Sequence, residues 1–197
     1  MPRVKEREYR NFSAPITTAP TEEGEKSYIV RGRAAVFDKP TCLYECGDTK
    51  YYEVIARGAL DGCDMTDVIF NYNHGGKVVA RLRNQTLKLF ISDDGLDIEA
   101  DLSGTVEGRN LYEEIEGGYI DKMSFSFSIK ESAYDCETHT RTITKIKKLY
   151  DVAAVDIPAY DTTSISARSF FEEEHSKTFR ALEQARRRKL LIAQTLL

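Results

Sequence analysis

Short runs of alternating or apolar residues, separated by turn residues, fill the stretch from Tyr28 to Leu102. Each run has the length and pattern of a strand, and each break contains Gly, Pro, Asn or Asp, which favour turns. Six strands within about 75 residues indicate a sheet that closes or folds on itself. The runs are YIVRGRAAVF (28–37), YYEVIA (51–56), DVIFNY (67–72), VVARL (78–82), TLKLFI (86–91) and GLDIEADL (95–102).

A different period marks residues 105–116, where Val106, Leu111 and Ile115 recur at helical spacing behind Thr105, a candidate N-cap. This pattern predicts a helix of about three turns that ends at Gly117. Residues 117–129, GGYIDKMSFSFSI, then alternate with period 2, which predicts a strand entered through a glycine turn. Its apolar face is Met123, Phe125, Phe127 and Ile129, and its polar face is Ser124, Ser126 and Ser128.

The serine face of this strand has two interpretations. The simpler one is the solvent-exposed side of a half-buried sheet, and it suits Ser126 and Ser128. The other concerns Ser124, the first serine after the turn, which is placed to act as a nucleophile.

Residues 141–157 follow a polar hairpin and read as two strand-like pieces, of which the second, 149–157, is nearly all apolar and ends before Pro158. Two acidic residues, Asp151 and Asp156, interrupt this apolar piece. Because a buried carboxylate is costly without a partner, Asp151 is expected to pair with a histidine or an arginine. Asp156, beside the proline, is expected to lie near solvent.

The two ends of the chain differ from its middle. Residues 1–26 are charged and lack apolar periodicity, which predicts a flexible arm. Residues 169–197 contain no Gly or Pro and predict an amphipathic helix around the basic block 186–189, which is either a solvated face or a docking surface for an acidic partner or nucleic acid. The domain between them, 27–168, is expected to be mainly β (α+β): a closed or partly open antiparallel β-barrel with a few packed helices.

Composition narrows the function classes. A net charge of −4 shows no basic excess, so nucleic-acid binding by the domain is not expected. No apolar run approaches the roughly 20 residues of a membrane span, and the first ten residues lack the core of a signal peptide, so a cytosolic protein is expected. Cys42, Cys46, Cys63 and Cys136 do not form paired C-x2-C arms, so idle thiols are expected, with a zinc site of Cys42, Cys46 and a histidine as the alternative. No cofactor is predicted.

A serine nucleophile requires a base, and the base requires a third group to orient it. The chain has three histidines. His139 in the polar hairpin and His175 at the start of the C-terminal helix are expected to be solvated. His74 follows an apolar run and precedes Gly75 and Gly76, which places it at a strand end, either as a base or in a structural role.

Several motifs occur in an order that resembles the prohead (procapsid) maturation serine proteases of tailed bacteriophages, distant relatives of the herpesvirus assemblins. The motifs are G-x-A-x-x-F (32–37), E-x-I-x-x-G-A (53–59), N-H (73–74), G-L-x-x-E-A-D (95–101), an acidic helix ending E-x-I-x-x-G, M-S-F-x-F (123–127) and D-V-A-A-V followed by I-P-A-Y (151–160).

The resemblance implies that Ser124 is the nucleophile, His74 the base and Asp151 the orienting acid of a serine endopeptidase. The relatives usually carry Glu at the third position, so the shorter Asp151 requires its strand to lie closer to His74. A second histidine serves there in the assemblins, but His139 lies in the hairpin.

The resemblance further implies substrates that are phage assembly proteins: the major capsid protein or its scaffold segment, and the protease itself, inside the prohead in the host bacterial cytoplasm. A homo-oligomer is compatible with this. The alternative is a non-enzymatic assembly or scaffold protein that retains the protease fold, with the C-terminal helix binding capsid protein.

Overall fold

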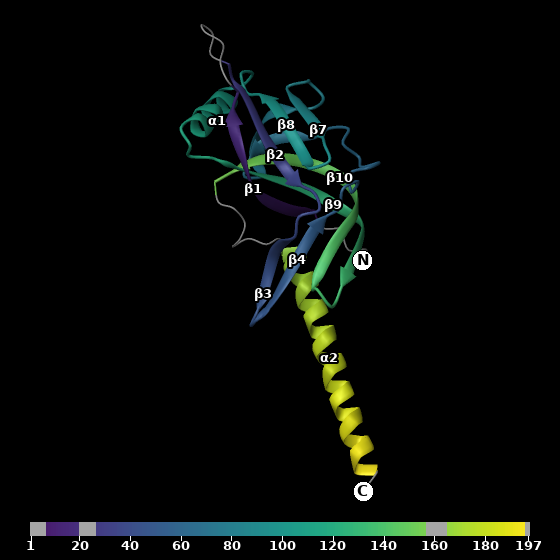
Figure 1. The fold of residues 1–197 in the computed structure, drawn as a ribbon. Helices are drawn as coiled ribbons and strands as arrows, with labels where there is room; N and C mark the ends of the chain where they lie inside the picture. The colour runs from purple at the N-terminus through teal and green to yellow at the C-terminus, as the bar shows by residue number, and fades with distance from the viewer. Residues whose placement is uncertain (1–6, 20–26, 157–164, 196–197) are drawn as a thin grey trace.

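The structure, a computed structural model, describes residues 7–19, 27–156 and 165–195, and it confirms a mainly β fold with two helices (Figure 1). In order, the elements are β1 (Glu8–Thr18), β2 (Ile29–Val36), β3 (Thr41–Cys46), β4 (Thr49–Ile55), β5 (Ile69–Tyr72), β6 (Gly75–Arg81), β7 (Leu87–Ile91), β8 (Gly95–Asp101), α1 (Val106–Glu116), β9 (Lys122–Asp135), β10 (Thr140–Val155) and α2 (Ile165–Thr195). All six strands expected between residues 28 and 102 are present.

The strands form one curled sheet in the order β3-β4-β10-β9-β1-β2-β8-β7, with β5 and β6 branching from β10. Within the described residues this path is open from β3 to β7, so a closed barrel is not shown. The sheet is also not purely antiparallel, because β10 runs parallel to β4 and to β5. The two strand-like pieces expected over 141–157 are one strand, β10, which bends through register shifts between Ile143 and Asp151. The residues after Asp156 lie outside the described part.

The expected flexible arm is wrong for residues 8–18. They form β1, which pairs with β9 through residues 8–15 and with β2 through residues 16–18. The rest of that arm, residues 1–6 and 20–26, lies outside the described residues, and the division at residues 27 and 169 stays a prediction. Hydrogen bonding to two neighbouring strands, rather than apolar periodicity, holds this segment in place.

Helix α1 forms as the sequence predicts. The Thr105 side chain accepts a hydrogen bond from the Gly108 amide at 2.8 Å. At the other end, the Gly117 amide donates to the Glu113 oxygen and the Gly118 amide donates to the Ile115 oxygen. These contacts satisfy backbone groups that have no partner inside the helix. Leu111, Tyr112 and Ile115 are buried, so the helix covers one end of the sheet (Figure 1).

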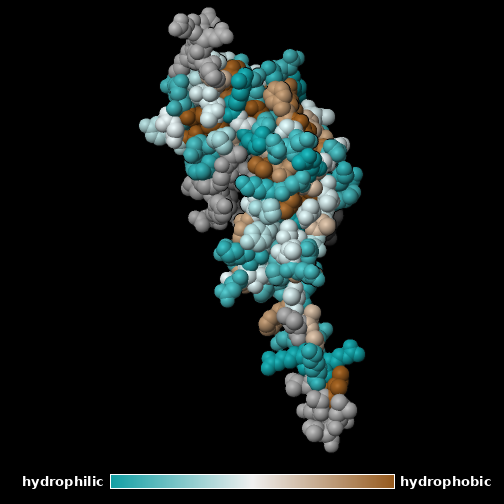
Figure 2. All heavy atoms as spheres, in the orientation of Figure 1, coloured by the Kyte–Doolittle hydropathy of each residue, from teal (hydrophilic) through white to brown (hydrophobic). Residues whose placement is uncertain are grey.

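Helix α2 begins at Ile165 and extends far beyond the sheet (Figure 1). Its first turns are anchored, because Phe171 is fully buried and packs on Tyr51 and Tyr134. Farther along, Phe179 and Ile192 are exposed, and Figure 2 shows a largely hydrophilic surface there. The helix is therefore present, but the amphipathic docking face expected for it stays a prediction.

This anchoring can be tested. Phe171→Ala should lower the free energy of unfolding by about 3 kcal/mol, because it removes a fully buried aromatic side chain. Phe179→Ala, two turns later on the same helix, should change it by less than about 0.5 kcal/mol. Urea titrations of the two variants measure both values, and equal losses would contradict the packing described here.

Candidate active site

Strands β9 and β10 bring two of the candidate residues side by side. Ser124 lies opposite Ala153, and Ser126 lies opposite Asp151, on neighbouring antiparallel strands. Ser124, Ser126 and Ser128 are all buried, so the interpretation of Ser126 and Ser128 as solvent-facing residues is wrong. The alternation identifies the two faces correctly, but β9 is an interior strand with both faces covered.

His74 reaches these strands from a tight hairpin between β5 and β6. Tyr72 pairs with Gly75, so Asn73 and His74 are the two central turn residues, with φ of 48° and 57°. Positive φ at both positions suits the twist of a two-residue hairpin, and Asn and His tolerate it better than most residues. Because β5 runs parallel to β10 with Tyr72 opposite Ala154, this turn lies beside the end of β10. His74 thus lies at a strand end, as expected.

Hydrogen bonds join the three candidates in a chain. His74 Nδ1 lies 2.6 Å from Asp151 Oδ1, and His74 Nε2 lies 2.5 Å from Ser124 Oγ. Ser124 is 0 % exposed and Asp151 is 1 % exposed. Although Asp is shorter than the Glu expected from the relatives, Asp151 reaches the His74 imidazole within hydrogen-bond distance. The arrangement has the connectivity that a nucleophile, a base and an orienting acid require.

Asp151 has two further partners that sequence reasoning missed. Ser126 Oγ donates to Asp151 Oδ1 at 2.8 Å, and the Arg7 guanidinium forms a salt bridge with Asp151 Oδ2. Arg7 also donates to Ser126 Oγ at 2.7 Å. The carboxylate buried in β10 is therefore fully paired, as its cost of burial demands. Arg7 had no signal in the sequence, because it belongs to a segment without periodicity.

The N-terminal segment also covers the serine and the histidine. The Tyr9 ring packs edge-on against the His74 ring, with centroids 4.8 Å apart. Ser124 Oγ lies 2.9 Å from the backbone oxygen of Arg10, which accepts a hydrogen bond from it. Since a hydroxyl has one proton, the Arg10 carbonyl competes with His74 Nε2 for it. The residues of β1 therefore occupy the space in front of the Ser124 hydroxyl.

The other two histidines lie elsewhere. His139 sits in the β9–β10 hairpin, as expected, but it is half-buried rather than solvated, because it lies beside Tyr134 and packs on the Tyr51 ring. His175 is half-buried rather than solvated, because its Nδ1 shares a 2.7 Å hydrogen bond with the Tyr51 hydroxyl. Its Nε2 lies 4.0 Å from Cys46 Sγ. Across the described ranges, no three His, Cys, Asp or Glu side chains converge in a way that could hold a metal ion.

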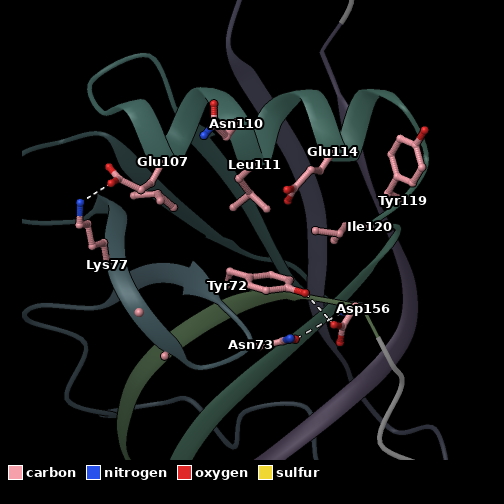
Figure 3. A pocket seen from close by; sticks show the side chains of 13 residues that line it. Tyr72, Asn73, Lys77, Glu107, Asn110, Leu111, Glu114, Tyr119, Ile120 and Asp156 are labelled. Carbon is pink, nitrogen blue, oxygen red and sulfur yellow. Dashed lines mark hydrogen bonds and ion pairs between the residues drawn. The ribbon is translucent and has the colours of Figure 1, made fainter.

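A cavity of about 740 Å³ lies between the His74 turn and α1 (Figure 3). Tyr119 and Ile120 close one side, and Lys77 and Glu107 form an ion pair at another. Asp156 lines the cavity and accepts a 2.6 Å hydrogen bond from Tyr72. Asp156 is exposed, as the sequence predicts.

Comparison with known proteins settles the family. The profile of the caudovirus prohead serine proteases matches residues 16–178. This chain belongs to that family. The family consists of serine peptidases of tailed phages that act in capsid maturation. No curated protein and no solved structure matches the chain. In the described residues, no helix is long and apolar enough to cross a membrane.

Proposed function

We propose that this prohead protease is a serine endopeptidase in which Ser124 is the nucleophile, His74 the general base and Asp151 the orienting acid. The observation that carries the proposal is the hydrogen-bonded chain from Asp151 through His74 to Ser124. A domain with a purely structural role has no need for this connectivity, which disfavours the non-enzymatic scaffold.

The reaction follows from this geometry. Ser124 Oγ attacks the scissile carbonyl carbon while His74 Nε2 takes its proton and later delivers it to the leaving amine. Asp151 accepts from Nδ1–H, fixes the tautomer and stabilises the imidazolium that forms. Proton transfer by a positioned base accelerates such reactions roughly 100- to 10,000-fold.

The proposed substrates are the major capsid protein or its scaffold segment, and the protease itself, inside the assembling prohead in the host bacterial cytoplasm. Family membership supports this setting. Helix α2, which projects from the sheet, would associate the enzyme with the nascent shell (Figure 1).

The test is coexpression of the full chain with its matching capsid protein, with intact masses of both followed over time. We expect one or both to shorten. In parallel, a fluorophosphonate should add one covalent adduct, which peptide mapping should locate at Ser124. Unchanged masses together with an unlabelled Ser124 would overturn the proposal and favour the scaffold function.

A further inference from the structure

The first half of β1 differs from the second in what it pairs with. Residues 8–12 pair with Met123–Phe127 of β9, and a register shift separates them from Pro15. Residues 16–18 pair with β2 instead. The family match begins at residue 16, so residues 8–15 lie outside it. Without these residues, β9 would have an unpaired edge next to Ser124, which is the kind of edge that binds an extended peptide.

The Arg10–Asn11 peptide bond lies at the candidate nucleophile. Asn11 is the register partner of Ser124, and the Arg10 carbonyl lies within hydrogen-bond distance of Ser124 Oγ. The segment thus lies as an extended strand beside the nucleophile, with a peptide carbonyl in front of it. If the Arg10–Asn11 bond were a scissile bond, Arg10 would be the residue on its acyl side.

The Arg10 side chain enters a buried acidic site on the opposite face of β9. Its Nη2 donates to Glu53 Oε2 at 2.8 Å, it forms an ion pair with Glu8, and its guanidinium packs on the Phe127 ring. Burial lowers the pKa of Arg10, but the Glu53 and Glu8 carboxylates outweigh it and hold the pKa above its usual value. The guanidinium therefore stays charged.

The charges on the two sides of this contact are complementary. The segment supplies an acid and an arginine two residues apart, Glu8 and Arg10. The body of the protein supplies Glu53 from β4 and Arg141 from β10, whose Nη1 lies 3.7 Å from Glu8 Oε2. A buried ion network adds little stability relative to apolar packing, but it discriminates strongly against a partner that lacks one of the charges. This favours recognition over simple stabilisation.

We propose that residues 8–12 occupy the substrate-binding position of the protease, and that Glu53 and Arg141 select Glu-x-Arg sequences for cleavage after the arginine, beginning with the chain's own Arg10–Asn11 bond. This inference rests on the proposed function. In the chain, the spacing recurs only at Glu107 and Arg109, where it lies within helix α1.

Self-cleavage at the Arg10–Asn11 bond would proceed by acyl transfer to Ser124 and then hydrolysis. Ser124 Oγ bonds to the Arg10 carbonyl carbon, the bond to the Asn11 nitrogen breaks, and that nitrogen takes the serine proton through His74. Water then hydrolyses the ester and leaves a carboxylate on Arg10. Loss of residues 1–10 would remove Arg7 from Asp151 and Tyr9 from His74, and would uncover the edge of β9 along Phe125–Phe127. The segment would therefore restrain the enzyme until it is cut.

The experiment follows the purified full chain by intact mass and N-terminal sequencing. A species beginning at Asn11 should accumulate in the wild type, and Arg10→Gln should slow its formation roughly 10- to 100-fold, the effect of losing a charged hydrogen bond. The processed enzyme should then cleave quenched peptides containing Glu-Tyr-Arg-Asn faster than Glu-Tyr-Gln-Asn by a similar factor. Glu53→Gln should remove that preference. Partial unfolding would lower both cleavage rates but would not change the ratio between the two peptides.

The inference is overturned if no Asn11 terminus forms, if Arg10→Gln is cut at that bond at the wild-type rate, or if Glu53→Gln keeps the preference for arginine. Capsid protein in the same samples separates the two proposals. If it is processed in a Ser124-dependent way while the Arg10–Asn11 bond stays intact, the protease assignment stands and the specificity fails. If neither substrate is cut and the fluorophosphonate leaves Ser124 unlabelled, both proposals fail.

Discussion

Ser124→Ala should abolish processing of the capsid protein and of the chain itself. Removing the nucleophile of a serine triad lowers the rate on the order of 10⁶-fold, because substrate binding and oxyanion contacts alone support only a small residual activity. The gel mobility and the intact mass of both proteins should therefore stay unchanged over days. The fold should survive, since Ser124 contributes a small side chain whose partners are His74 and the Arg10 carbonyl.

The same strand offers a matched control. Ser128 lies two positions beyond Ser126 on the same face of β9 and is similarly buried, but its hydroxyl has no hydrogen-bond partner among the described residues. Ser128→Ala should leave processing within about twofold of wild type and should not lower stability, since it removes an unsatisfied buried hydroxyl. If Ser124→Ala and Ser128→Ala behaved alike, the nucleophile would have to be assigned elsewhere.

The sequence predicted those parts of the site that lie on regular elements. Alternation located the strand of Ser124, and an apolar run followed by two glycines located His74 at a strand end. Asp151 was marked by its apolar neighbours, because a carboxylate in such a strand needs a partner. These signals are local, and each depends on a periodicity or on a turn of a few residues.

The parts that the sequence missed depend on which strands become neighbours. Whether the serine face of β9 is exposed to solvent depends on which elements pack over it. The periodicity of the strand carries no information about those elements. Residues 8–12 have no apolar pattern, yet β9 offers them an edge and Glu53 offers Arg10 a partner. The parallel pairing of β10 with β4 and β5 is equally non-local, as is the contact of His175 with Tyr51.

Asp151→Asn should slow processing by roughly 10⁴-fold while leaving the fold intact, because an asparagine amide does not hold His74 in the tautomer that accepts the serine proton. The variant also loses the ion pair between Asp151 and Arg7, so part of any change in stability comes from the uncompensated arginine. The decisive readout is therefore the rate for correctly folded protein, with circular dichroism and a urea midpoint measured on the same sample.

Asp156→Asn is the control, because Asp156 lies five residues later, is exposed and contacts the Tyr72 hydroxyl rather than His74. An asparagine oxygen can accept the same hydrogen bond, so processing should stay within about threefold of wild type. Equal losses in the two variants would show that Asp151 is not the orienting acid. A large loss for Asp156→Asn alone would instead assign a substrate contact to the cavity beside α1 (Figure 3).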